Sequence, residues 1–362
     1  MKKVLAFPQL GDYFYPIRKF LKATTNLEVI DVPPITKKTI ALGSKYSPDS
    51  VCVPFKYNLG NFVEALDMGA TVLLQAGGGC RYRYYAEVQE TILKDLGYQF
   101  ELIQFMEKDK LRLQEFYQML QDLNPTLKKR TFYYQALFTF CYISYLDKID
   151  DYIRKNIGFE VEKGRFLKLK KHFIEACDST KKIHTLRKIY QNYIKELHHV
   201  KVQKPKNCLK VGIIGELYTA MEPFSTYQLE KMLASYHIEI KRFTNLSYLL
   251  WKKALLTPLM RYKVRHYCKY TLGADGLDNV YRVLWLKKHH YHGVIHTKPS
   301  GCTPEIGALP IIQKAAKDMT LPILFLSLDE QTAAEGLQTR VEAFYDLLYF
   351  KKEGKNESLF RN

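Results

Sequence analysis

Short apolar runs that alternate with helix-like segments constrain this fold more than any other feature of the sequence. The first such stretch has apolar runs at residues 4–7, 29–32, 71–74 and 99–105, with helical patterns at residues 12–22, 58–68 and 83–96. Gly69 and Gly97 follow two of these helical patterns, and glycine is favoured just past a helix end. Strands that alternate with helices indicate βαβ units and a mostly parallel sheet.

The same plan returns later in the chain. The second stretch has predicted strands at residues 209–215, 238–243, 292–296 and 321–328, with helical patterns at residues 304–317 and 335–350. Residues 106–205 instead have only two glycines and long helical periodicity, and they end in a polar linker at residues 201–207. We therefore predict an α/β fold of two Rossmann-like domains whose mostly parallel sheets face a cleft. The predicted parts are a first α/β domain at 1–105, a helical basic insertion at 106–205, and a second α/β domain at 206–362 with a helical stretch at 245–290.

The net charge of +18 is concentrated in two blocks. Residues 106–205 carry 21 basic and 12 acidic residues, and residues 241–290 carry 11 basic and 2 acidic, so each block has a net charge of +9. The rest of the chain is balanced. Such blocks suit nucleic acid, anionic lipid or a phosphate-rich small ligand, and simple solubility is the alternative explanation.

Composition excludes several classes of protein. A chain of 362 residues that is 47% hydrophobic is neither disordered throughout nor a small disulfide scaffold. No apolar run reaches the roughly 18 residues that a membrane span needs. The basic start at Lys2 and Lys3 is typical of a signal peptide, but Pro8 and Gly11 end the apolar run that follows it. We therefore expect a first strand there, no membrane segment and a cytoplasmic protein.

Three of the seven cysteines lie in loops. Cys80 follows a predicted strand and the turn at 77–79, Cys302 follows the strand predicted at 292–296, and Cys52 follows a loop at 46–50. Ligands of open α/β sheets bind outside the carboxyl ends of the strands. The other cysteines lie inside regular periodicity and are predicted to be core residues: Cys141, Cys177, Cys208 and Cys268.

Thiolates that converge from distant parts of a chain suit a soft metal or an iron–sulfur cluster. The three loop cysteines are separated by 28 and 222 residues, which matches no local ferredoxin signature. Spacing alone therefore leaves open whether Cys52, Cys80 and Cys302 form one site or are unrelated.

The residues around these cysteines resemble a known family. The segment 52–56 and the strand-plus-cysteine segment 72–80 are similar to the ligand motifs of the 2-hydroxyacyl-CoA dehydratase superfamily. The C-terminal segments 299–305, 321–324, 327–332 and 336–344 are the most specific part, and 33–36, 211–216 and 223–225 also fit. The chain resembles the branch called CoA protein activase, or acyl-CoA dehydratase activase-related protein. The resemblance is strong at the cysteine loops and the C-terminus, and weak in 106–205 and 245–290.

The resemblance implies an iron–sulfur cluster, commonly [4Fe-4S], that three cysteines hold between two α/β domains. By motif position the ligands are Cys52, Cys80 and Cys302. Relatives include dehydratase subunits, benzoyl-CoA reductase subunits and proteins with a larger double-cubane cluster. In the dehydratases a separate ATPase drives one electron into the cluster at very low potential, and a ketyl radical then allows a 2-hydroxyacyl thioester to lose water.

The sequence departs from the name activase. The ATPase of the family has an actin-like fold with glycine-rich phosphate loops, which this sequence lacks, and the turn at 77–79 is no P-loop because Gly-Lys-Ser/Thr does not follow it. We therefore expect no ATPase activity and no identifiable catalytic residue. The expected partner is an actin-like-fold ATPase activator or a related dehydratase or reductase subunit, with an acyl-CoA substrate. Two alternatives stay open, namely a non-catalytic cluster-bearing partner and a basic nucleic-acid-binding protein with structural cysteines.

Other side chains carry weaker signals. A histidine group suits either a metal or a solvated helix end: His289, His290, His292 and His296. The segment 81–85 mixes arginine and tyrosine, which suits an anionic cluster, a phosphate or an ordinary helix start. Lys56 and Lys298 lie close in sequence to Cys52 and Cys302, which suits an offset of negative charge on cluster sulfurs, but the default expectation for both is a solvated lysine.

Two further groups have structural explanations. A role next to the cluster ligands or a structural role suits four residues, namely Glu216, Gln338, Arg340 and Glu342, and an Arg340–carboxylate pair that holds the final helix is the simpler explanation. The basic residues near Trp251 suit RNA, but no RNA-binding module contains them.

Overall fold

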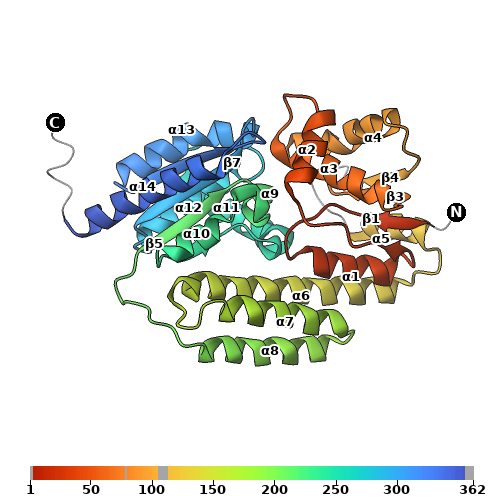
Figure 1. Ribbon diagram of the computed structural model, residues 1–362, viewed down its shortest axis with the longest axis horizontal. Helices are drawn as coiled ribbons and strands as arrows, with labels where there is room; N and C mark the ends of the chain where they lie inside the picture. The colour runs from red at the N-terminus through yellow and green to blue at the C-terminus, as the bar shows by residue number, and fades with distance from the viewer. Residues whose placement is uncertain (1–2, 78–79, 105–112, 355–362) are drawn as a thin grey trace. The chain divides into compact units, whose positions relative to one another are not determined.

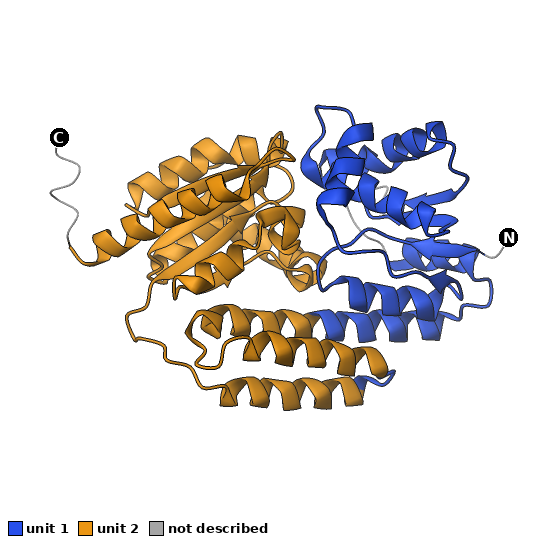
Figure 2. Ribbon diagram, viewed as in Figure 1, with its two compact units in different colours: residues 1–143, 180–183 blue, residues 144–179, 184–362 orange. Residues whose placement is uncertain are grey.

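The computed structural model describes residues 3–77, 80–104 and 113–354, and it divides into two compact units. Unit 1 comprises residues 1–143 and 180–183, and unit 2 comprises residues 144–179 and 184–362 (Figure 2). The domain boundaries and the cleft predicted from the sequence stay predictions.

A four-stranded parallel sheet forms the centre of unit 1. Its strands are β1 (Val4–Ala6), β2 (Glu28–Val29), β3 (Val72–Gln75) and β4 (Glu101–Gln104), in the order β2-β1-β3-β4. All pairs are parallel, with Leu5 opposite both Val29 and Val72. Each strand lies where an apolar run predicts one, although β2 is only two residues long.

Helices follow each strand of unit 1. They are α1 (Phe14–Thr24), α2 (Lys37–Tyr46), α3 (Val53–Asp67), the 3₁₀ turn η1 (Arg81–Tyr84), α4 (Tyr85–Asp95), α5 (Leu113–Leu123) and the first half of α6 (Lys129–Asn156). The sequence analysis missed α2. It begins at a capping box between Thr36 and Thr39, and it packs closely on α3 because Gly43 and Gly60 leave no side chain between the two backbones.

Unit 2 repeats the strand order of unit 1. Its strands are β5 (Lys210–Gly215), β6 (Glu239–Arg242), β7 (Gly293–Pro299) and β8 (Ile323–Leu328), in the order β6-β5-β7-β8. All three pairs are parallel. Two parallel sheets with interleaved helices confirm the predicted α/β fold of two Rossmann-like halves (Figure 1).

Helices cover both faces of the second sheet. The helical elements after β5 are α9 (Leu217–Met221), η3 (Phe224–Thr226), α10 (Leu229–Ser235), the π-helical turn η4 (Tyr248–Lys252), α11 (Lys253–Val264), α12 (Gly276–Lys288), α13 (Thr303–Asp318) and α14 (Ala334–Lys352). Ile214 packs with residues of α11, α12 and α13, whereas Val211 and Ile213 pack with α10 and α14. This alternation follows from the two-residue repeat of a strand.

The part of the chain that follows β4 and precedes β5 is mostly long helices. They comprise the second half of α6, η2 (Ile157–Phe159), α7 (Arg165–Ser179) and α8 (Ile183–His199). Buried ion pairs hold this segment within unit 2: Arg154 contacts Asp150 at 3.0 Å and Glu230 of α10 at 2.9 Å. Burial raises the pKa of Asp150, but the charges of Lys170 and Arg154 outweigh it and lower that pKa to about 2.

Among residues 3–77, 80–104 and 113–354, no helix combines the length and the apolar character that crossing a bilayer requires.

Candidate functional site

Each of the three loop cysteines is the N-cap residue of a helix. Cys52 precedes α3, Cys80 precedes η1, and Cys302 precedes α13. The first turn of a helix presents unpaired N–H groups and a partial positive charge, both of which favour a thiolate. The three cysteines therefore share a position at a helix start, although only the Cys80 side chain accepts a backbone N–H there, from Tyr82.

The chain begins two of these helices with the same short pattern. Pro54 and Pro304 each lie two residues after a cysteine, in the first turn of α3 and α13. Proline suits this position because its missing N–H would have no helical partner there. Gly301, just before Cys302, has a φ of +78°, a backbone conformation that a residue with a side chain rarely adopts.

Cys80 and Cys302 follow corresponding strands of the two sheets. β3 and β7 both lie between the first strand of their unit and an edge strand, and each cysteine begins the helical segment after that strand. The carboxyl end of such a strand is where open α/β sheets bind ligands. Cys302 is 8% exposed, Cys52 is half-buried and Cys80 is exposed.

One tyrosine contacts Cys52. The Tyr85 hydroxyl lies 2.6 Å from Cys52 Sγ. Burial raises the pKa of Tyr85, and negative charge on Cys52 raises it further. Tyr85 therefore stays protonated and donates its hydrogen bond whenever Cys52 is a thiolate.

Polar residues behind Tyr85 hold the cysteine-bearing segments together. Asn58 of α3 donates to the Tyr82 hydroxyl, and the rings of Tyr82 and Tyr85 lie 5.0 Å apart. Gln75, the last residue of β3, donates to Gln89 at 2.8 Å. The segment 81–85 is thus a helix start whose tyrosines contact α3. Sequence reasoning missed Asn58 and Gln75, although each interrupts an otherwise apolar segment.

A second polar group lies buried beside the Cys302 helix in unit 2. Glu305, the third residue of α13, accepts a 2.8 Å hydrogen bond from Asn279 and lies 2.6 Å from His296 Nε2. Asn279 accepts from Arg282 Nη1 at 2.8 Å and from the Gly215 backbone N–H at 3.2 Å. At most 2% of each of these four side chains is exposed. They fix the start of α13 against β5, β7 and α12.

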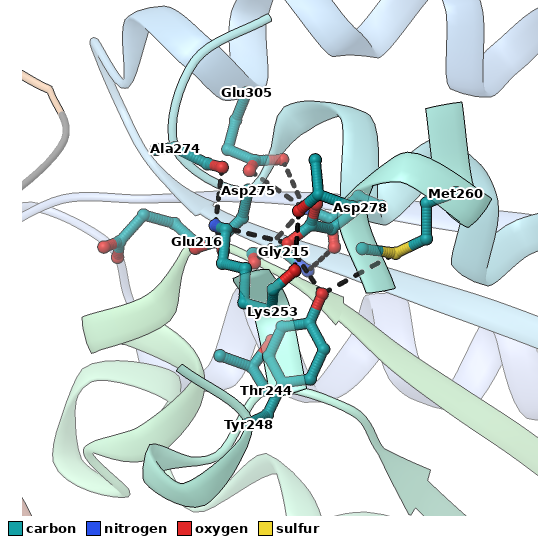
Figure 3. Close-up of polar contacts among 12 residues, drawn as sticks. Gly215, Glu216, Thr244, Tyr248, Lys253, Met260, Ala274, Asp275, Asp278 and Glu305 are labelled. Atoms are coloured by element: carbon teal, nitrogen blue, oxygen red, sulfur yellow. Dashed lines mark hydrogen bonds and ion pairs between the residues drawn. The ribbon is translucent and has the colours of Figure 1, made fainter. Parts of the chain in front are cut away.

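Charged residues of α11 and α12 adjoin this group (Figure 3). Lys253 lies 2.8 Å from Asp275 and 3.2 Å from Asp278, and the Tyr248 hydroxyl donates to Asp278 at 2.9 Å. Burial opposes a charge on Lys253, but the two aspartates outweigh it and raise its pKa. Burial also raises the pKa of Asp278. Sequence reasoning missed this group, although Asp275 and Asp278 are the only acids in 245–290.

Glu216 lies at the carboxyl end of β5. Its carboxylate accepts from the backbone N–H groups of Tyr218 and Thr219, as the N-cap of α9. Burial nevertheless raises its pKa to about 7. The preceding Gly215 has a φ of +136°, and a Cβ there would lie 1.8 Å from the carbonyl oxygen of Thr297. The role of Glu216 as a cap agrees with the structural explanation given from the sequence.

The four clustered histidines do not form a metal site. His296 is fully buried on β7, whereas His292 accepts from the Lys210 backbone and His289 stacks on Trp285 at 3.6 Å. Across the described ranges, no three His, Cys, Asp or Glu side chains gather as a group that could hold a metal. A cluster on the three cysteines therefore stays a prediction.

The environments of three basic residues differ from those expected. Lys56 and Lys298 are 3% and 6% exposed, so neither is the solvated lysine that the sequence suggested. They lie on α3 and β7, whose residues are almost all buried. Arg340 donates to the carbonyl of Phe325 at 2.5 Å instead of pairing with a carboxylate. It still joins the last helix to the sheet.

The remaining cysteines have packing roles. Cys177, Cys208 and Cys268 are buried, and Cys141 is half-buried on α6. None of the seven cysteines, all within the described ranges, forms a disulfide. The prediction of a core position therefore fits Cys177, Cys208 and Cys268, whereas Cys141 is only partly covered.

Comparison with known proteins gives one family. Residues 247–348 match the model of 2-hydroxyglutaryl-CoA dehydratase, D-component. The matched segment contains Cys302 and the buried residues around Glu305, and no curated protein matches the chain. The match does not distinguish the activase-related branch from its relatives. Together with the motifs at the cysteines, this match over residues 247–348 supports the resemblance to the 2-hydroxyacyl-CoA dehydratase superfamily.

Proposed function

We propose that this chain is an iron–sulfur subunit that carries low-potential electrons, or performs radical dehydration or reduction, for an acyl-CoA-type substrate. Cys52, Cys80 and Cys302 supply the thiolate ligands. The observation that carries the proposal is that each of these cysteines, and none of the other four, is the N-cap of a helix.

The donor set fits such a cluster. Thiolates are soft ligands that suit iron–sulfur chemistry, and a helix N-terminus stabilises the negative charge that a ligated thiolate carries. Within unit 1, Tyr85 contacts Cys52, and its ring packs on Tyr82 of η1, the turn that Cys80 begins. Three ligands suit a [4Fe-4S] cluster with one iron that lacks a protein thiolate, and a larger double-cubane cluster is the alternative.

The surrounding residues have definite roles in this proposal. When bound, the cluster supplies an electron at low potential and a Lewis-acidic iron. Tyr85 donates a hydrogen bond to Cys52 Sγ and orients it. Glu305 and Asn279 hold the first turn of α13, so the position of Cys302 is set before a ligand arrives.

The chain needs a separate source of electrons. The sequence contains no phosphate loop of the kind that an ATPase requires, and the matched family is named as one component of a dehydratase. We therefore propose an actin-like-fold ATPase activator, or a related dehydratase or reductase subunit, as the partner. The alternative function, nucleic-acid binding through the basic blocks, predicts a colourless protein that co-purifies with RNA and releases it when salt is added.

Anaerobic purification tests the proposal. We expect a brown protein with about four irons and matching sulfide per chain, as a single cubane requires. Replacing Cys52, Cys80 or Cys302 by alanine should remove most of the iron and of the visible absorbance, because a cluster with three anchors does not survive the loss of one.

The chain offers matched controls. Alanine at Cys177 or Cys268 removes a buried thiol without touching a helix N-cap, so iron content should be unchanged. The proposal is wrong if wild type purified without oxygen binds no iron, or if all seven single variants keep it.

A further inference from the structure

An exposed apolar stripe runs along one face of η4 and α11. It consists of Trp251, Leu255, Leu259 and Tyr262, which are 62%, 67%, 46% and 61% exposed. Their spacing of four, four and three residues places them on one side of a helix. A soluble protein rarely leaves a contiguous row of large apolar side chains in water unless the row binds something.

The opposite side of the same helix is fixed in the core. Met260 and Val264 are at most 2% exposed and belong to the hydrophobic core of unit 2. Lys253, at the first position of α11, is held by Asp275 and Asp278. The helix is therefore anchored, and its exposed stripe is presented on a rigid element.

Positive charge flanks the stripe. Residues 245–274 contain six lysines and arginines and no acidic residue. At 100° per residue, Lys252 and Lys263 lie on one side of the stripe, and Arg261 and Arg265 lie on the other. The Arg265 guanidinium lies 4.0 Å from the centre of the Tyr262 ring. An apolar centre with a basic rim has the composition of a protein interface core.

We propose that this stripe docks a partner protein that offers an apolar groove with an acidic rim. The inference rests on the proposed function in one respect, since it names the partner as another subunit of the same enzyme. The matched family is named as one component, and the match includes the stripe.

The alternatives fit the stripe less well. A second copy of the same face would bring like charges together, which disfavours a homodimer through it. RNA would use the cations and the aromatic rings but leave Leu255 and Leu259 without a partner. An anionic membrane would bury only four side chains from a short helix, whereas peripheral binding strengthens with buried apolar area.

Site-specific cross-linking tests the proposal. In cells that make the protein, a photoreactive phenylalanine analogue replaces Leu255. A second strain carries the same analogue in place of Leu167, a leucine of α7 that is 49% exposed, as the control. Irradiation should give one adduct from position 255 and none from 167. The captured protein is identified and purified, and its affinity for the unlabelled chain is measured at low and at physiological salt.

The proposal requires three results from the reconstituted pair. Affinity should fall at least tenfold in Leu255→Ser, should fall with added salt, and should be unchanged in Leu167→Ser. Iron content should be equal in all these variants, so a failure of docking is distinct from a failure of the cluster proposal. Absence of an adduct, an RNA adduct, a basic partner, or flotation with vesicles of equal parts phosphatidylcholine and phosphatidylglycerol would each overturn it.

Discussion

The two α/β units share one plan and place different chemistry on it. Both sheets are parallel, and both order their strands second, first, third, fourth. In both, the third strand leads to a cysteine at a helix start, Cys80 in unit 1 and Cys302 in unit 2. The two units therefore place a cysteine at the same position of the shared fold, directly before the helical segment that follows the third strand.

The helix before the third strand shows the difference. In unit 1 this helix is α3 and its N-cap is Cys52, whereas in unit 2 it is α12 and its N-cap is Asp275. A thiol in one unit thus corresponds to a carboxylate in the other, and Asp275 is paired with Lys253. Unit 1 therefore has two candidate ligands, while unit 2 has one candidate ligand and a carboxylate that is paired with a lysine.

A buried asparagine connects the same elements in both units. Asn61 of α3 accepts from the Gln9 backbone after β1 and donates to Glu64, whereas Asn279 of α12 accepts from Gly215 at the end of β5 and donates to Glu305. Only Asn279 also binds an arginine, Arg282. The same structural link is therefore more highly charged in unit 2.

The largest expected effect is a loss of stability that is confined to unit 1. In Gly60→Ala a Cβ would lie 1.9 Å from the carbonyl oxygen of Thr39, so α2 and α3 must move apart. We expect a loss of about 4 kcal/mol or more in the free energy of unfolding of unit 1. Hydrogen exchange should show faster exchange in β1 and β3 than in wild type, and little change in β5 and β7.

A helical glycine of unit 2 gives the matched control. Gly307 lies in α13 with no atom within 4 Å of the position of a new Cβ. Gly307→Ala should therefore stabilise by roughly 0.5–1 kcal/mol, because alanine loses less backbone entropy in a helix. If exchange accelerates equally in both sheets of Gly60→Ala, the two units unfold together and do not differ as we argue.

Replacing the buried asparagine should cost more stability in unit 2, where its partners carry more charge, than in unit 1. Asn279→Ala removes a partner from both Glu305 and Arg282, so it should cost about 3 kcal/mol. Asn61→Ala leaves one buried carboxylate with fewer partners and should cost about 2 kcal/mol. Denaturant unfolding of the two variants measures the difference, and an equal or reversed order would contradict the comparison.

The strands were the most predictable part of both units. The predicted strand segments overlap all eight strands, and the apolar runs at β1 and β3 are typical of buried parallel strands, whereas β6 mixes apolar and charged residues. β2 is shorter than its run because Pro33 and Pro34 follow it closely and cannot donate to a ladder. Helix α2 was missed because it packs through small residues such as Thr39 and Gly43, which give no apolar periodicity.

The site was predictable only where its signal is local. The helix predicted at 304–317 begins close to the Cys-x-Pro pattern at Cys302, whereas α3 begins at Val53, right after Cys52 and five residues before the helix predicted at 58–68. The contact of Tyr85 with Cys52 joins residues 33 apart, and that of Asn279 with Gly215 joins residues 64 apart. Such contacts depend on tertiary packing, which no local pattern encodes.

A pH-dependent effect should come from unit 2. The pKa of Glu216 is raised from 4.5 to about 7, so the folded state binds more protons than the unfolded state between these values. Stability should therefore fall as pH rises from about 4.5 to 7, by roughly 2 kcal/mol once partial exposure is allowed for. The position directly after β1 of unit 1, which corresponds to Glu216, is Phe7 and carries no carboxylate.

The variant Glu216→Gln tests this assignment. Glutamine keeps an oxygen to accept from Tyr218 and Thr219 but does not titrate, so the decline in stability between pH 4.5 and 7 should flatten. Denaturant unfolding across this range measures it. An unchanged slope in the variant would assign the pH dependence to another group.

The smallest expected effect concerns Tyr85, which contacts a candidate ligand in unit 1. Tyr85→Phe removes the hydroxyl 2.6 Å from Cys52 Sγ but keeps the ring that packs on Phe55. Stability should change by about 1 kcal/mol, the usual net value of one hydrogen bond. Iron content should be kept, whereas the reduction potential should become more negative, because a hydrogen bond to a ligand sulfur stabilises the more negatively charged reduced cluster.

Tyr98→Phe is the control, since the Tyr98 hydroxyl donates to Asp67 in the same unit and contacts no cysteine. Equal potentials in wild type and in Tyr85→Phe would mean that Cys52 does not hold the cluster through the thiol that Tyr85 contacts, and the asymmetry between the two units would then lie elsewhere.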